Sequence, residues 1–329
     1  MEWDSGFEKT KVFLGEVVRP LVPFAGYFDV EIRLSENRPA DSFEGQLRQE
    51  NLFLGSPYAY GGANRFIHFT SKEGLLGIIE SGYIRTTAIG NLAPGHSEFD
   101  GLKCFTADNN SRNQVRSKTE TLKDVFTLSM CESNVEMQNS EWMWTKYGQQ
   151  HEGAFLEFSM AHEQTFRHLV GKVIYDDNHY HLQQLNDRII DFQRAHKFDT
   201  NNYPSLFAEL LAFHKPSSFS IENEVRWYYS QNPQLKHKFV VGEHRTSDNL
   251  KRPHSRIFLR NVHHEIPGNT PTSISEETIP SIYLHRVVLG CKNTAEDEAW
   301  IKQRFRQVMN ESGYRFEVVR RGGFGAAPM

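Results

Sequence analysis

Glu222 and Glu224 are two residues apart in residues 219–229, where apolar and polar residues alternate as in a β-strand. Side chains two apart on a strand share a face, so we expect the two carboxylates side by side. When two carboxylates are buried together, the pKa of one rises, and that group then suits a general base. Alternatively, this is a solvated strand face on which Arg226 forms ordinary ion pairs. Lys215 and Arg226 either neutralise these glutamates or donate charge-assisted hydrogen bonds to a pyrophosphate.

A second group of polar residues surrounds His68, at the end of a segment with strand composition. Thr70 and Glu73 have the spacing of a capping box, and Gly82 suits a left-handed helix end, so a helix is predicted between them. The N–H groups at a helix N-terminus attract phosphate, which makes His68, Thr70 and Ser71 candidate ligand contacts. A histidine bonded to the backbone and a threonine that only caps a helix explain the same residues.

Aromatic side chains and a histidine precede the next predicted strand. Tyr147 offers a flat face on which a planar ligand can stack, and Trp144 lies three residues before it. Both also fit an aromatic stripe packed into the core. His151 and Gly153 either line a cleft or form the turn before the strand.

No metal centre is expected from the sequence. The pairs His179 with His181 and His263 with His264 lack a cysteine or carboxylate partner at ligand spacing. The glycine-rich signatures of dinucleotide or phosphate loops are also missing.

The elements that must position these residues form a mixed set without regular alternation, which favours an α+β fold. Expected strands are residues 12–18, 66–69, 83–87, 102–106, 125–131, 154–158 (half-buried), 173–175, 219–229, 284–289 and 316–319. Expected helices are residues 42–53, the segment after Thr70, much of residues 181–214, and the segment that begins with a capping box at Thr294–Asp297. Residues 88–101 are expected to form a long polar loop, of the kind that is often functional.

The composition is that of a soluble globular protein: 329 residues, 38% hydrophobic, 12% aromatic and 24% charged, with a formal net charge of -4. This charge gives no global signature for nucleic acid or an anionic membrane. The three cysteines form no CxxC pair, which favours a reducing, cytoplasmic compartment. No secretory signal is expected, and no membrane span, because no apolar run approaches about 18 residues. We expect an N-terminal extension packed on the core (1–60), one α+β domain (61–320) and a flexible tail (321–329).

Three blocks of sequence together resemble a bacterial family known only as a domain of unknown function, DUF2971. They are residues 68–82, residues 143–153, and Lys215 with residues 219–226. The resemblance extends over residues 64–320. One segment departs from it: after the first helix the family carries an Asn-Asp-Pro-x-Glu-like segment, and here residues 95–101 read Gly-His-Ser-Glu-Phe-Asp-Gly.

A more distant resemblance is to the ADP-ribosyltransferase superfamily, including its DNA- and RNA-modifying branches. It rests on the His-x-Thr strand with its following helix and on Glu222-x-Glu224 at the start of a strand. It implies a mixed, split-sheet fold with flanking helices and an NAD-holding cleft. Glu224 would be the key carboxylate, stabilising the oxocarbenium-like state in which the nicotinamide–ribose bond breaks.

The remaining roles also follow from this resemblance. Glu222 and Tyr147 would complete the catalytic group. The residues that would hold NAD are His68, Thr70, Ser71, Trp144, His151, Lys215 and Arg226.

The sequence therefore predicts an NAD-dependent ADP-ribosyltransferase-like enzyme that modifies a nucleic acid or a protein, as a toxin or in phage defence. One alternative is a nucleotide- or nucleic-acid-binding module without chemistry. Another is an NAD glycohydrolase, for which water is the acceptor. The enzymatic interpretation requires His68 and the acidic pair, Glu222 and Glu224, to line opposite walls of one crevice.

Overall fold

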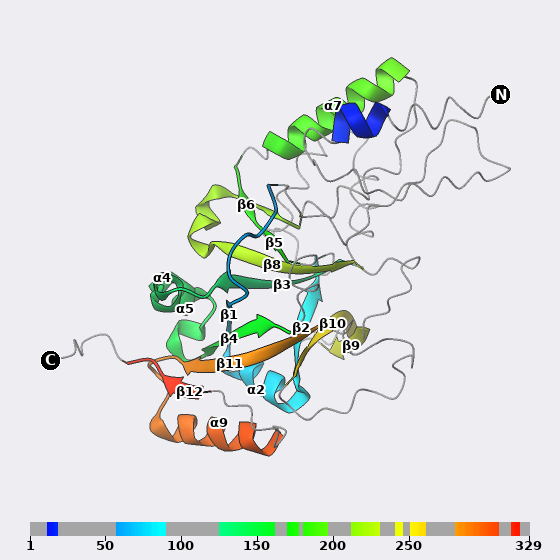
Figure 1. Cartoon of the computed structure of the whole chain (residues 1–329). Coiled ribbons are helices and arrows are strands. Elements are labelled where there is room, and N and C mark those ends of the chain that lie inside the picture. Colours follow the sequence, from blue (N-terminus) through cyan, green and yellow to red (C-terminus); the bar gives the residue numbers. More distant parts are fainter. Residues whose placement is uncertain are drawn as a thin grey trace.

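The computed structural model describes residues 12–18, 57–89, 125–161, 170–177, 180–196, 212–230, 241–245, 251–260, 280–308 and 317–322. In these residues a large β-sheet is flanked by helices (Figure 1). The strands of this sheet are β1 (Phe66–Thr70), β2 (Tyr83–Ala88), β3 (Val125–Glu132), β4 (Ala154–Met160), β5 (Val170–Lys172), β8 (Glu224–Ser230), β9 (Val241–Arg245), β10 (Lys251–Leu259), β11 (Ser281–Leu289) and β12 (Glu317–Arg320). A separate pair consists of β6 (Ile174–Tyr175) and β7 (His214–Lys215).

Along the chain, the helices alternate irregularly with these strands and vary in length. They are α2 (Lys72–Ser81), α4 (Val135–Asn139), α5 (Glu141–Lys146), α7 (Tyr180–His196) and α9 (Ala295–Val308). Further helical segments, of the π or 3-10 type, are η1 (Leu14–Val18), η7 (Gln149–His151) and η8 (Ser217–Glu222). None of the helices in the described part of the chain has the length and apolar character needed to cross a membrane.

Six strands close into a ring, in which each strand is hydrogen-bonded to the next: β1, β4, β11, β10, β2 and β3, with β3 paired again to β1. The ring closes where Phe66 pairs with Glu132 and Ile67 with Cys131. β8 and then β5 extend the sheet beyond β3. β11 is parallel to β10 and β12, whereas the other pairings of the large sheet are antiparallel. The mixed sheet of an α+β fold is thus confirmed.

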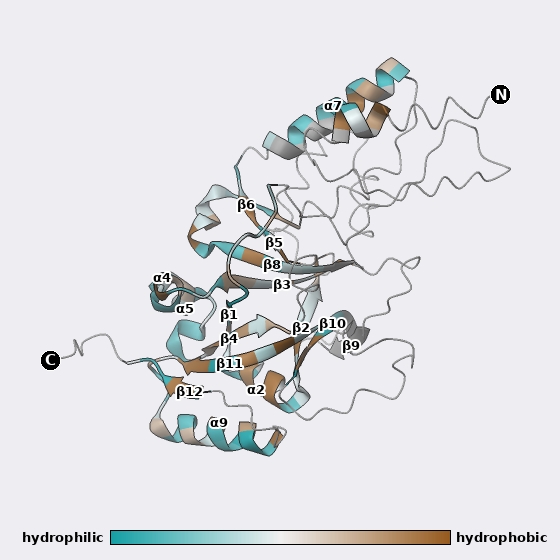
Figure 2. Ribbon diagram, in the orientation of Figure 1, coloured by the Kyte–Doolittle hydropathy of each residue, from teal (hydrophilic) through white to brown (hydrophobic). Residues whose placement is uncertain are grey.

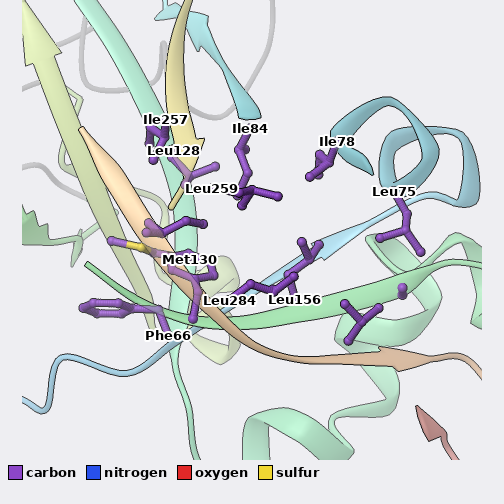
Figure 3. Close-up of a cluster of buried hydrophobic side chains, with 14 of the residues drawn as sticks. Phe66, Leu75, Ile78, Ile84, Leu128, Met130, Leu156, Ile257, Leu259 and Leu284 are labelled. Atoms are coloured by element: carbon purple, nitrogen blue, oxygen red, sulfur yellow. The ribbon is translucent and has the colours of Figure 1, made fainter. Parts of the chain in front are cut away.

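The larger hydrophobic cluster gathers side chains from all six strands of the ring. Figure 3 shows Phe66, Met130, Leu156 and Leu284, from four different strands, close together, with Leu75 of α2 on one side. Each such buried side chain contributes about 1.5–3 kcal/mol relative to exposure, so this cluster holds the sheet together. Hydrophobic residues are prominent on β11 and α2, whereas α9 presents many hydrophilic ones (Figure 2).

The helix α2 begins one residue later than the sequence predicts. Ser71 is the N-cap, and its Oγ accepts a hydrogen bond from the Gly74 N–H at 3.0 Å. Thr70 is instead the last residue of β1, because its pairing with Ala154 keeps it extended. At the other end, Gly82 has φ 71° and forms the predicted left-handed cap.

The predicted strand at residues 12–18 is wrong, because this segment is helical. Phe13 and Val17 are four residues apart and both are buried, which is the spacing of one helix face. The Phe13 ring packs edge-on against Phe192 of α7, with 5.1 Å between ring centroids. Packing against α7 therefore decides the conformation here.

The strand predicted at residues 219–229 starts only at Glu224, because residues 217–222 form the 3-10 turn η8. The half-buried strand predicted at residues 154–158 is buried on both faces, since Leu156 packs into the larger cluster on one face and Phe155 into a second hydrophobic cluster on the other. The helix predicted in residues 181–214 is confirmed for residues 180–196, residues 197–211 lie outside the described part of the chain, and His214 lies in a strand.

Other predicted elements are confirmed with boundaries that differ by at most three residues, the largest shift being the start of β11 at Ser281 instead of residue 284. Strands occur at residues 83–88, 125–132, 174–175, 281–289 and 317–320. The capping box at the start of α9 is also formed: Thr294 Oγ1 accepts from the Asp297 N–H at 3.1 Å, and Asp297 Oδ2 accepts from the Thr294 N–H at 2.8 Å. The expected helix at 42–53, strand at 102–106 and most of the loop at 88–101 lie outside the described residues.

The predicted tail starts too early. Arg321 is bonded to the core, since its backbone N–H donates to the Leu289 carbonyl at 2.8 Å and its guanidinium lies 3.3 Å from His151 Nδ1. Residues 323–329 lie outside the described part of the chain. In the N-terminal extension, Tyr58 is buried, with its hydroxyl 2.8 Å from His214 Nε2.

Candidate functional site

Glu224 lies on the outer face of the sheet, opposite the larger hydrophobic cluster. Ile67 pairs with Cys131, and Cys131 pairs with Glu224, so the three side chains point to the same face. Ile67 belongs to a smaller cluster with Trp144 of α5, which identifies this face as the one that α4 and α5 cover. Arg226, two residues after Glu224, shares the face.

Four charged side chains form a buried network on this face. Lys215 Nζ donates to Glu222 Oε2 at 2.7 Å and lies 2.6 Å from Glu224 Oε2. Arg226 donates from Nε to Glu224 Oε1 at 2.7 Å and from Nη2 to Glu224 Oε2 at 3.2 Å. Its Nη1 donates to the Ala212 carbonyl. Each of the four residues is at most 3% exposed, so the charges compensate one another away from solvent.

Glu222 and Glu224 lie close together, as predicted, but not because they share a strand face. Glu222 ends η8 rather than sharing a strand face with Glu224. Asn223 between them has φ 40° and ψ 48°, a left-handed conformation that asparagine adopts more readily than most residues. This turn directs both carboxylates toward the ammonium group of Lys215, which β7 supplies.

The network also sets the ionisation of Glu224. Burial alone would raise the pKa of this carboxyl, but the charges of Arg226 and Lys215 and their hydrogen bonds outweigh burial and hold its pKa well below the usual range. The predicted rise of the pKa therefore does not occur at Glu224. This residue supplies a fixed negative charge at neutral pH.

Glu222 is the member of the acidic pair that connects to the surface. The Tyr147 hydroxyl donates to Glu222 Oε1 at 2.6 Å, and Lys146 Nζ lies 3.4 Å from the same oxygen. Burial, followed by the bond to Glu222, raises the pKa of Tyr147, so its phenol stays protonated and acts as a donor. Tyr147 is 36% exposed and marks where this chain of hydrogen bonds reaches solvent.

Three aromatic rings surround the Lys146 ammonium group at this point. Its Nζ lies 4.3 Å from the ring centroid of Trp142, 4.3 Å from that of Phe219 and 5.1 Å from that of Tyr147. Trp142 and Tyr147 meet edge-on at 5.7 Å. We call Trp142, Tyr147 and Phe219 the aromatic cage; it adjoins Glu222, which the Tyr147 hydroxyl and the Lys146 ammonium group both contact.

The side chains of Cys131 and Tyr175 also contact the network, but neither supplies a nucleophile. Cys131 Sγ donates to the Glu222 carbonyl at 3.1 Å, and burial raises the pKa of this thiol, so it is no activated nucleophile. The hydroxyl oxygen of Tyr175 accepts from the Glu224 N–H at 2.8 Å. In the part of the chain that the structure describes, no group of three or more side chains could hold a metal ion.

His68 does not share this site. It follows Ile67 in a regular strand and pairs with Leu156 of the larger cluster, so its side chain lies on the inner face of the sheet. Its Nδ1 bonds the Ser129 carbonyl at 2.8 Å, and burial lowers its pKa. The sheet therefore separates His68 from Glu224, and the single crevice required by the sequence-based interpretation is not formed by these residues.

The sequence predicts that N–H groups at the N-terminus of α2 are available to a phosphate, but in the structure they are bonded to other groups of the protein. Besides the bond from Gly74 to Ser71, the Lys72 N–H donates to Gln149 Oε1 at 2.9 Å. The Leu75 N–H donates to the Ser71 carbonyl at 2.9 Å. The protein's own groups thus satisfy these donors, and the roles of Thr70 and Ser71 in holding NAD stay predictions.

Trp144 and His151 lie together beside the site rather than in it. Trp144 is fully buried, and its Nε1 donates to the Gln138 carbonyl at 2.9 Å. The His151 ring stacks on Trp144 at 5.8 Å, with its Nε2 2.6 Å from Glu141 Oε1. Trp144 is therefore a packed core residue, and His151 belongs to the turn next to it.

Most of the site lies in a segment that matches a known protein family, and Trp142 lies one residue before it. Residues 143–227 match the family described as "Protein of unknown function (DUF2971)", and this range holds Tyr147, the acidic pair and its two cations. The chain matches no curated protein and no solved structure.

Sequence reasoning missed three residues of the site: Trp142, Lys146 and Phe219. Trp142 and Lys146 are four apart, the spacing at which side chains meet on a helix, so this pair carried a detectable signal. Phe219 carried no such signal, because the sequence predicts a strand at residues 219–229. The Phe219 ring reaches Lys146 only because residues 217–222 form a 3-10 turn instead.

Proposed function

We propose that the outer-face site, without any contribution from His68 on the other side of the sheet, cleaves NAD and transfers ADP-ribose to an acceptor, which is a nucleic acid or a protein. The observation that carries this proposal is the hydrogen bond from Tyr147 to Glu222, which links a buried carboxylate to the surface beside the partly buried rings of Trp142 and Phe219. Glycosidic bonds of this kind break through a cationic state, which a fixed carboxylate stabilises.

The reaction needs little acid chemistry. The C1′–N1 bond breaks, its electron pair leaves with nicotinamide, and the positive charge of the ring is lost as charge develops on the ribose. The acceptor then forms a bond to C1′ and releases a proton. Glu222 stands beside the ribose in this account, with Tyr147 orienting its carboxylate.

The geometry favours Glu222 over Glu224 as the carboxylate nearest the substrate. Both oxygens of Glu224 are engaged by the buried cations Arg226 and Lys215, whereas Oε1 of Glu222 is held by Tyr147 and Lys146, whose side chains reach the surface. Glu224 then acts by holding Lys215 against Glu222, which keeps the whole network in place. Lys215 and Arg226 are accordingly counterions of the acidic pair and not ligands of a pyrophosphate.

The test is nicotinamide release from NAD, followed by chromatography with extracts of nucleic acid and protein as acceptors. Glu222→Gln is expected to lower the rate by about 100-fold or more, the scale on which a group that stabilises transition-state charge acts. Glu136→Gln, an exposed carboxylate on α4, serves as the matched control. Equal rates for wild type and Glu222→Gln would exclude the assignment. Release of free ADP-ribose alone would identify a glycohydrolase.

A further inference from the structure

The aromatic cage holds a cation that belongs to the protein itself. All three ring centroids lie within the roughly 6 Å at which a cation and a ring attract one another. Glu222 Oε1, 3.4 Å from Lys146 Nζ, closes the cage from below with a negative charge. Three rings over a carboxylate form an arrangement that recognises cations rather than neutral rings.

The two lysines on Glu222 are held very differently. Lys215 is buried and contacts the acidic pair at 2.7 and 2.6 Å. The side chain of Lys146 is 37% exposed, and its 3.4 Å distance to Glu222 exceeds the roughly 2.7–2.9 Å of a good charge-assisted bond. A lysine ammonium is also strongly hydrated and carried on a flexible stem, so it can leave for solvent.

We propose that the aromatic cage is a binding site for a soft organic cation, which displaces the Lys146 ammonium when it binds. A methylated ammonium or a pyridinium ring is less hydrated than a lysine ammonium and gains more from the rings. The identification of the occupant as the pyridinium ring of NAD rests on the proposed function. Lys146 then acts as an internal competitor that holds the cage in shape.

Competition makes a specific prediction about affinity. The cage binds an external cation only in the fraction of molecules from which Lys146 has moved away, so removing the ammonium raises the apparent affinity. Lys146→Met keeps the length and apolar stem of the side chain. It is expected to bind N-methylnicotinamide about tenfold more tightly than wild type, which corresponds to about 90% occupancy of the cage by Lys146.

Isothermal titration calorimetry with small cations tests this without any catalytic step. N-methylnicotinamide and tetramethylammonium are the charged probes, and neutral nicotinamide is the uncharged match. Trp142→Leu and Phe219→Leu are expected to lose binding. Trp300→Leu, an exposed tryptophan on α9, is expected to retain it. Circular dichroism of each variant verifies that it is folded.

Unchanged or weaker binding by folded Lys146→Met would overturn the proposal, and so would equal binding of neutral nicotinamide. Tighter binding of N-methylnicotinamide than of tetramethylammonium supports the pyridinium, whereas the reverse order overturns that identification. The titration measures binding only, so it can confirm the cage even if the protein does not cleave NAD. Conversely, NAD cleavage without cation binding at the cage would support the proposed function and overturn this inference.

Discussion

Lys215 is the residue on which the acidic pair depends. Without its ammonium group, and among the described residues, Glu222 would keep only the partly exposed Lys146 as a cation, and Glu224 only Arg226. Removing one partner of a buried ion network leaves charge uncompensated in a medium of low dielectric constant. Lys215 therefore combines a structural role with the role proposed for it in the candidate site.

We predict that Lys215→Met lowers the free energy of unfolding by about 3–5 kcal/mol, the usual effect of breaking a buried pair. Urea denaturation measures this. The matched control is Lys292→Met, because Lys292 and Glu152 form an exposed pair at 3.9 Å. Such pairs contribute about 0–1 kcal/mol. If both variants lose the same small amount, the network does not hold the site together.

Among the elements, the turn η7 is the most constrained. Three consecutive residues, Gln149, Gln150 and His151, have φ values of 51°, 51° and 71°. A left-handed conformation costs a non-glycine residue roughly 1–2 kcal/mol, so neighbouring contacts must hold this turn. Gln149 accepts from the α2 N-terminus, and His151 stacks on Trp144, which ties the turn to two helices.

Gly153 lets this turn approach β1. A Cβ atom at this position would lie 2.2 Å from the Thr70 carbonyl oxygen and 3.1 Å from the Gly148 backbone. Gly153→Ala is therefore expected to destabilise the protein by about 1–3 kcal/mol through overpacking.

Gly77 provides the opposite case on a nearby helix. It lies inside α2, and a Cβ there would meet nothing within 4 Å. Gly77→Ala is expected to raise the free energy of unfolding by about 1 kcal/mol through helix propensity. Thermal denaturation of both variants checks the pair, and a stable Gly153→Ala protein would contradict the described packing of the turn.

For the molecule as a whole, the sequence predicts local structure better than pairing. Gly82 and the Thr294–Asp297 box mark helix ends because their signals lie within a few residues. Closure of the ring joins β1 to β3 through residues such as Phe66 and Glu132, which are 66 positions apart, and no local pattern encodes that contact. The 3-10 turn before Glu224 was missed because alternating residues in 219–223 imitate a strand.

The same difference in scale applies to the candidate site. The acidic pair and Tyr147 were predicted from residue types, and the structure brings Tyr147 to Glu222. His68 was joined to them by sequence likeness alone. Its separation follows from strand register, because a shift of one residue moves a side chain to the other face of a sheet.

The most direct measurement is a crystal structure of the protein soaked with a non-cleavable NAD analogue. Our account predicts the nicotinamide ring between Trp142 and Phe219, with the Lys146 ammonium displaced and the ribose beside Glu222. Density for the analogue on the His68 side of the sheet, or Lys146 still in the cage beneath a bound analogue, would contradict it.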